Sequence, residues 1–274
     1  MIRNIPPIVL MFFSTISFAQ DEIAKSSWVT SPVKIDGKPQ EWKLPLRYYD
    51  AGTKLFFAFA NDDKNLYLCF QAPDEMSQVK IMRAGMEVYL SVKGKHKVSV
   101  SFPLAQQSVP TPLQNDNNSQ PGQELKNRRT SFILQNTLME VKGFETKNGF
   151  IPINDSSGIN AAINWDENDK LTYEMSIPLK EWFGINFTAP DMSKDITLDI
   201  EINAVKWRGH TGSGGGSNGF SGRGRSGGAG GMPHGRNTNT DEENSALPGE
   251  NKYLLFQKSK LKEKFILAQD DSRK

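Results

Sequence analysis

The feature that most constrains the fold is a succession of short segments rich in β-branched and aromatic residues, separated by Gly, Pro, Asn and Asp. Residues 55–60 and 66–71 flank the polar stretch 61–65, which can adopt the backbone angles of a tight connection, so they predict an antiparallel hairpin. Residues 86–92 and 97–102 predict a second hairpin. Further strands are expected at residues 132–141, 158–164, 171–177, 196–207, 253–257 and 265–268.

Helix is scarce in the sequence. Residues 180–183 suit a single turn, because Pro178 fits the entry to a helix and Gly184 fits the exit. Residues 76–84 are the other short helical candidate. Many strands with almost no helix between them exclude a parallel α/β sheet, so we expect an all-β protein, either a sandwich or a barrel.

Two stretches fall outside the strand pattern. Residues 106–127 are rich in Gln, Asn, Ser and Pro, and thirteen of the chain's 23 glycines lie between residues 209 and 235. Such segments cannot bury enough apolar area to offset the entropy of ordering, so we expect two long disordered loop insertions, at about 106–127 and 208–250. Because strand-like segments stand on both sides of the glycine-rich insert, a single domain is expected over residues 20–268, followed by a polar tail at 269–274.

The first residues have the pattern of a cleaved signal peptide. Arg3 precedes an apolar stretch, and small residues stand before a cleavage point after Ala19. The apolar stretch is shorter than the roughly 20 residues needed to span a bilayer. We therefore expect residues 1–19 to be removed and the protein to be secreted or periplasmic, with no integral membrane segment afterwards. The single cysteine, Cys69, lies in an apolar run and is expected to be buried.

Composition and motifs argue against several functions. A formal net charge of +2 gives no electrostatic basis for binding nucleic acid. Metalloprotease, serine hydrolase and phosphate-binding motifs are absent, and the histidines are scattered. Glu87, Glu140, Glu174 and Asp199 lie in strand-like segments, where a glycosidase pair is conceivable but solvated strand faces normally carry such residues. We expect a noncatalytic protein.

Five tryptophans could offer flat apolar faces for stacking on sugar rings. Trp42 and Trp182 lie beside a turn and in the short helix, and both are expected in the core. Trp165 and Trp207 lie near strand or loop ends, where binding residues concentrate, so they are the candidates for ligand contact.

Several segments, taken in order, resemble carbohydrate-binding module family 9 and the related DOMON-like sandwiches. The opening motif is Ile35-Asp36-Gly37 followed by Glu41-Trp42. Two further segments are similar to the family's hairpin motif: an Asp-rich turn before Leu66-Tyr67-Leu68, and Pro73-Asp74 after the next strand. The strand Met86-Glu87-Val88-Tyr89-Leu90 matches the family's glutamate-centred strand. The stretch from Tyr173 to Trp182, which contains Ile177-Pro178, and residues 196–203 are similar to two later strands of the family. The resemblance extends over about 230 residues.

This resemblance implies an antiparallel Ig-like or jelly-roll β-sandwich that binds a polysaccharide or oligosaccharide, with Glu87 near the sugar. It also implies that a structural calcium ion could be held, for which Asp62, Asp63 and Asp74 supply oxygen donors. The two tryptophans that clamp the sugar in characterised members are missing. Residues 82–85 stand in the place of the first, and the glycine-rich insert in the place of the second.

Three other functions remain open. A DOMON-like domain can hold a haem and transfer electrons, which would require axial ligands such as His96 with Met86 or Met139. The second alternative is a polysaccharide-processing glycoside hydrolase. The third is a surface interaction protein in which the sandwich is only a scaffold and the inserts recognise a partner.

Overall fold

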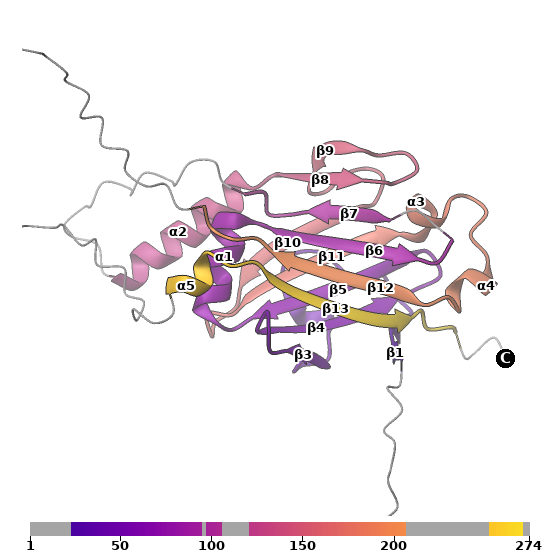
Figure 1. Ribbon diagram of the computed structural model, residues 1–274, viewed down its shortest axis with the longest axis horizontal. Helices are drawn as coiled ribbons and strands as arrows, with labels where there is room; N and C mark the ends of the chain where they lie inside the picture. Colours follow the sequence, from indigo (N-terminus) through magenta and orange to yellow (C-terminus); the bar gives the residue numbers. More distant parts are fainter. Residues whose placement is uncertain (1–22, 95–96, 106–120, 207–251, 271–274) are drawn as a thin grey trace, which may run out of the picture.

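The computed structural model describes residues 23–94, 97–105, 121–206 and 252–270, which form two β-sheets stacked face to face (Figure 1). The expected signal peptide, the glycine-rich insert, His96 and Trp207 lie outside these residues, as does most of the first expected loop. The expected all-β sandwich is confirmed. No helix of the described residues is both long and apolar enough to cross a membrane.

The front sheet in Figure 1, sheet A, has seven strands. Neighbouring strands are antiparallel except for β1 and β13, which run parallel. In spatial order the strands are β1 (Ala24–Lys25), β13 (Ser259–Ile266), β12 (Ile196–Ile202), β6 (Met86–Val92), β7 (Val98–Ser101), β8 (Leu138–Lys142) and β9 (Gly149–Pro152).

The rear sheet, sheet B, has six strands and is also antiparallel apart from the short pairing of β2 with β4. Both hairpins predicted from the sequence are present, because β4 pairs with β5 and β6 pairs with β7. In spatial order the strands are β10 (Asn160–Trp165), β11 (Leu171–Pro178), β5 (Asn65–Ala72), β4 (Leu55–Asn61) and β2 (Ser27–Trp28), with β3 (Tyr48–Asp50) also on β4.

The two sheets bury one continuous hydrophobic core between them. Along β6 and β12 every second residue is buried, which is the period that places one face of a strand inward and the other outward. The core includes Met86 and Met139, and both are fully buried. Burying this apolar area is what stabilises a chain that has a single cysteine and so no internal disulfide.

The α-helices of the described residues, α1 to α5, lie at the two ends of the sandwich (Figure 1), and one 3-10 turn, η1 (Pro39–Glu41), follows the first residues of the chain that the structure describes. Asp74 caps α1 (Glu75–Ala84) by accepting a hydrogen bond from the Ser77 N–H at 2.9 Å. This helix and α3 (Leu179–Phe183) confirm the two helices predicted from the sequence. The other helices are α2 (Pro121–Gln135), α4 (Ala189–Met192) and α5 (Lys252–Leu255).

Two of these helices correct the predictions from sequence. The end of the loop expected at 106–127 is helical, because α2 begins at Pro121, and the strand expected at 132–141 starts only at Leu138. Phe132 is an aromatic residue that favours a strand prediction, but in the structure it belongs to α2 and its ring packs against the ring of Trp165. Residues 253–257 were expected as a strand, yet α5 occupies 252–255 and the last strand begins at Ser259.

The end of the fold is joined to its beginning. The Ala268 N–H donates to Ser26 Oγ and to Asn61 Oδ1, both at 2.8 Å, and the Asn61 side chain donates back to the Ala268 carbonyl at 3.0 Å. The Ser26 hydroxyl also donates to Asn61. All three residues are buried, so these bonds tie β1, β4 and the end of β13 together away from water.

Residues 29–42, the N-terminal strap, run across the outer face of sheet B. Val33 packs there on Ala60 and Tyr67, with Ile35 and Trp42 beside them. The strap explains why every residue of β11 is buried, although only alternate residues point into the core. Strand β5 is likewise buried on both faces, including Cys69 as predicted.

Glu174 fastens the strap to sheet B. Its carboxylate accepts hydrogen bonds from the N–H groups of Asp36 (3.1 Å) and Gly37 (2.8 Å) and from the Trp42 indole N–H (2.9 Å). Glu174 is fully buried, so the expectation of a solvated strand position is wrong. Since sequence gives no sign that a distant segment covers this face, strand alternation alone could not predict the burial.

Burial raises the pKa of Glu174 to about 7, although its three hydrogen-bond donors act in the opposite direction. The folded protein therefore binds this proton more tightly than the unfolded chain, in which the pKa is near 4.5. We expect the free energy of unfolding to fall by up to about 3 kcal/mol as pH rises from 4.5 through 7. Urea unfolding at several pH values measures this, and Glu174→Gln should remove the trend; an unchanged slope in that variant would assign it to another group.

Candidate functional site

The outer face of sheet A is the open face of the sandwich. It is turned toward the viewer in Figure 1, where the helices of the described chain lie at the two ends and leave its middle uncovered. The register of the strands aligns its side chains in rows across β12, β6 and β7. We call the central residues the platform: Glu87, Tyr89, Ser99, Ser101, Asp199 and Glu201.

Glu87 lies at the centre of one row. Ser101 is directly opposite on β7 and donates its hydroxyl to Glu87 Oε1 at 3.2 Å, while Glu201 is directly opposite on β12. Two like charges side by side are unfavourable. Lysines relieve this, because Lys258 and Lys260 donate to the two oxygens of Glu201 at 3.0 and 2.6 Å. Glu87 is therefore a half-exposed carboxylate that lies between a hydroxyl and an ion-paired carboxylate.

Tyr89 lies in the next row, between Ser99 and Asp199. The ammonium group of Lys97 is 3.8 Å from the centre of its ring, a cation–π contact. Burial, a hydrogen bond with Glu87 and the charges of nearby acids raise the pKa of Tyr89, so its hydroxyl stays protonated at neutral pH. The platform thus joins a phenol, the Ser101 hydroxyl and carboxylates on one surface, whereas Ser99 in the same row is buried.

Aromatic and charged groups border the platform. Phe150 on β9 is directly opposite Glu140 on β8, which is opposite Ser101, and the Phe150 side chain is 66% exposed. On the other border, Lys260 and Lys262 of β13 stand opposite Glu201 and Asp199. Hydroxyl groups of a ligand could bond to the central oxygens, and the C–H face of a ring could lie on the aromatic groups.

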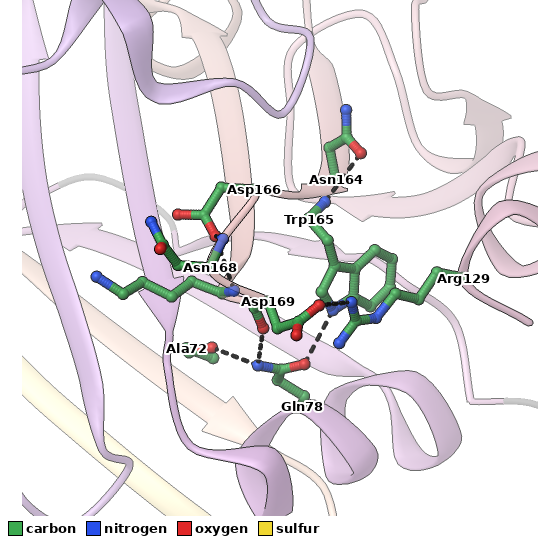
Figure 2. Close-up of polar contacts among 9 residues, drawn as sticks. Ala72, Gln78, Arg129, Asn164, Trp165, Asp166, Asn168 and Asp169 are labelled. Carbon is green, nitrogen blue, oxygen red and sulfur yellow. Dashed lines mark hydrogen bonds and ion pairs between the residues drawn. The ribbon is translucent and has the colours of Figure 1, made fainter. Parts of the chain in front are cut away.

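Trp165 lies elsewhere, at the end of β10, where Gln78 of α1 and Arg129 of α2 approach its ring (Figure 2). Its indole N–H donates to Gln78 Oε1 at 2.9 Å, and the ring of Phe132 meets it edge-on with centroids 6.0 Å apart. The guanidinium of Arg129 lies over the ring, 5.3 Å from its centre, and forms an ion pair with Asp169. These contacts fix α2 to the sandwich.

The structure does not bring the predicted ligand residues together. Glu87 points outward from sheet A, whereas Trp165 is half-buried and packs against the core from sheet B. Trp207 lies outside the described residues. A role for Trp165 in ligand contact stays a prediction, and the arrangement in Figure 2 gives it a structural role as well.

The predicted calcium ligands are also apart. Asp62 precedes β5 and accepts hydrogen bonds from Lys64 N, Asn65 N and the Tyr67 hydroxyl at 2.6 to 2.7 Å. Asp74 follows the far end of the same strand, where it caps α1 and pairs with Lys54. Within the described ranges, no group of three or more acidic, His or Cys side chains is placed to hold a metal ion.

The two methionines considered as haem ligands, Met86 and Met139, are packed in the hydrophobic core, and His96 lies outside the described residues. Of the two tryptophans expected in the core, one lies there and the other is half-buried outside sheet B. Trp182 is fully buried, and Trp42 packs with the strap while donating to Glu174.

The fold defines an antiparallel β-sandwich protein, and the comparisons with known proteins add little to it. No model of a known family and no curated protein matches the chain. Among solved structures, it is similar to a carbohydrate binding module family 9 (CBM9) protein from Caldicellulosiruptor kristjanssonii in complex with glucose. The identity is 13% and the TM-score 0.33, over 67% of this chain and 79% of that chain, which is too distant to assign a family or a ligand.

Sequence reasoning selected Glu87 but missed its neighbours. Ser99, Ser101 and Tyr89 alternate with core valines and leucines in their strands, so their shared outward face could be predicted from the period. Local sequence patterns could not predict that β6 pairs with β12. This pairing joins residues more than one hundred positions apart and brings Asp199 and Glu201 beside Tyr89 and Glu87.

Proposed function

We propose that the chain is an exported, noncatalytic saccharide-binding protein and that the platform carries the ligand. The observation that supports this is Glu87, held between the Ser101 hydroxyl and Glu201 on a sheet face that no helix of the described chain covers. A carboxylate beside hydroxyl groups can accept bonds from vicinal hydroxyl groups of a sugar, and charge-assisted bonds are the strong ones.

The open shape of the platform favours an extended ligand. The row through Glu87 runs across six neighbouring strands, from Phe150 near one edge of sheet A to Lys260 near the other. At the usual spacing of about 4.8 Å between strands, this face spans several sugar units. A polysaccharide or oligosaccharide chain lying across the strands would meet both rows.

The proposal is tested with the protein lacking residues 1–19, by affinity electrophoresis in gels that contain a range of polysaccharides. We expect Glu87→Gln and Tyr89→Ala each to weaken retention by about tenfold or more, since a hydrogen bond to a charged group contributes about 1.5–3 kcal/mol. Tyr49→Ala is the matched control, because Tyr49 is an exposed tyrosine on β3 of the opposite sheet.

Two outcomes would contradict the proposal. A folded protein that no polysaccharide retards would refute saccharide binding in this form. If Trp165→Phe abolished retention while the two platform variants kept it, the ligand would lie at the end of the sandwich shown in Figure 2 and not on the platform.

A further inference from the structure

A hollow of about 500 Å³ lies beside edge strand β10, on the opposite side of the sandwich from the platform. The N-terminal strap forms one wall with Val33 and Ile35, and the chain before β10 forms another with Ile153 and Asn154. Its volume falls within the range of about 300–1,000 Å³ that is usual for small-molecule sites.

The polar groups of the hollow are amides and hydroxyls. Asn160 donates to the Gly158 carbonyl at 3.2 Å and to Ser176 Oγ at 3.3 Å, and the Asn65 side chain donates to the Tyr67 hydroxyl at 3.2 Å. Those bonds use the amide N–H groups. Within the described part of the chain, the Oδ1 atoms of Asn65 and Asn160 accept no hydrogen bond, so they are free to accept from a ligand.

The lining carries no charged side chain. Two carboxylates lie close by, and neither lines the hollow: Asp62 accepts the Tyr67 hydroxyl at 2.7 Å, and Glu174 accepts the N–H groups of the strap. A charged ligand would lose its hydration here without gaining a counter-charge, which is unfavourable. A neutral ligand avoids that cost.

Small residues keep the hollow open. Ala162 lies on the face of β10 that the strap covers, directly opposite Glu174 on β11, which binds the strap. Gly158 has φ of +90°, and a Cβ there would come within 2.9 Å of Pro178. Aliphatic walls from the strap face these positions, so the hollow offers apolar surface for C–H groups together with free amide oxygens for O–H groups.

From this combination we infer that the hollow binds a small neutral polyhydroxylated molecule of about the size of one sugar ring. A ring of that kind presents C–H faces to Val33 and Ile35 and hydroxyl donors to Asn65 and Asn160. The site is separate from the platform and does not depend on it.

Backbone amide NMR titration with glucose, galactose and mannose tests the inference, with glucuronate and glucosamine as the charged counterparts. We expect saturable shifts at residues 65–67, 153–162 and 176 for at least one neutral sugar. Either charged analogue should bind at least tenfold more weakly than its neutral parent. Ala162→Leu should weaken binding at least tenfold, because the larger side chain fills the hollow. Asn154→Trp should have the same effect from the rim of the hollow, and because Asn154 is exposed this variant should leave the fold intact.

The double variant Glu87→Gln/Tyr89→Ala separates this site from the platform. It should lose retention by polysaccharides but keep the shifts at the hollow. The inference is overturned if none of the three neutral sugars shifts these residues at sugar concentrations of up to about 100 mM. It is also overturned if the shifts appear at Glu87 and its neighbours instead, or if glucuronate binds as well as glucose. None of these results depends on whether the platform binds a polymer.

Discussion

Replacing Glu174 with alanine is expected to lower the free energy of unfolding by about 4 kcal/mol or more. The carboxylate accepts three hydrogen bonds from the strap, and its removal leaves the N–H groups of Asp36 and Gly37 and the Trp42 indole N–H without a partner. Each buried unpaired group costs about 1–3 kcal/mol, and the cavity adds to that.

Urea denaturation followed by tryptophan fluorescence measures this loss. Glu87→Ala is the control, since it removes the same side chain from the solvent-facing side of the other sheet, and it should cost less than about 1 kcal/mol. Equal losses in the two variants would mean that the strap is not held by Glu174. Trp42→Phe removes one donor only and should give an intermediate loss.

Gly37→Ala should cost about 3 kcal/mol or more. Gly37 has φ of +75°, and an added Cβ would lie 2.7 Å from the backbone nitrogen of Asn164 on β10. Backbone cannot move aside as the end of a side chain can, so the strap would have to lift from the sheet and weaken its bonds to Glu174.

Gly94→Ala separates the two contributions to this cost. Gly94 has φ of +81°, but no atom of the described residues lies within 4 Å of the position of its Cβ, so only the strained backbone conformation is penalised, at about 1–2 kcal/mol. The difference in free energy of unfolding between the two variants reports the close approach of strap and sheet. If the two losses were equal, the contact at Asn164 would contribute nothing to stability.

The strand pattern predicts most of the sandwich because burial alternates wherever a single face is covered. Residues 86–92 and 196–202 show this period in the sequence and in the structure. The same reasoning fails at Glu174, whose face is covered by a segment well over one hundred residues away. The Asp36-Gly37 turn and Trp42 are recognisable in the sequence as a motif. The sequence does not show that the group they bind is Glu174.

The candidate site was predictable only in part, for a related reason. The outward direction of Glu87 follows from its strand, but its neighbours Ser101 and Glu201 come from two other strands. Trp165 was chosen for its place near a strand end. The residues around Trp165 include Arg129 and Phe132 of α2. The sequence pattern predicts a loop and a strand where α2 lies, so it could not show that a helix packs on Trp165.

The hydrogen bonds that join Ser26 and Asn61 to Ala268 have a consequence for how the molecule assembles. The bond from Ala268 to Ser26 spans 242 positions, so it can form only when the whole intervening chain is available. Closing so large a loop is entropically costly and slows folding. As the chain emerges from a ribosome or a translocation pore, its opening strands must wait for its last ones, and we expect folding to be a late, all-or-none event with no stable half-sandwich along the way.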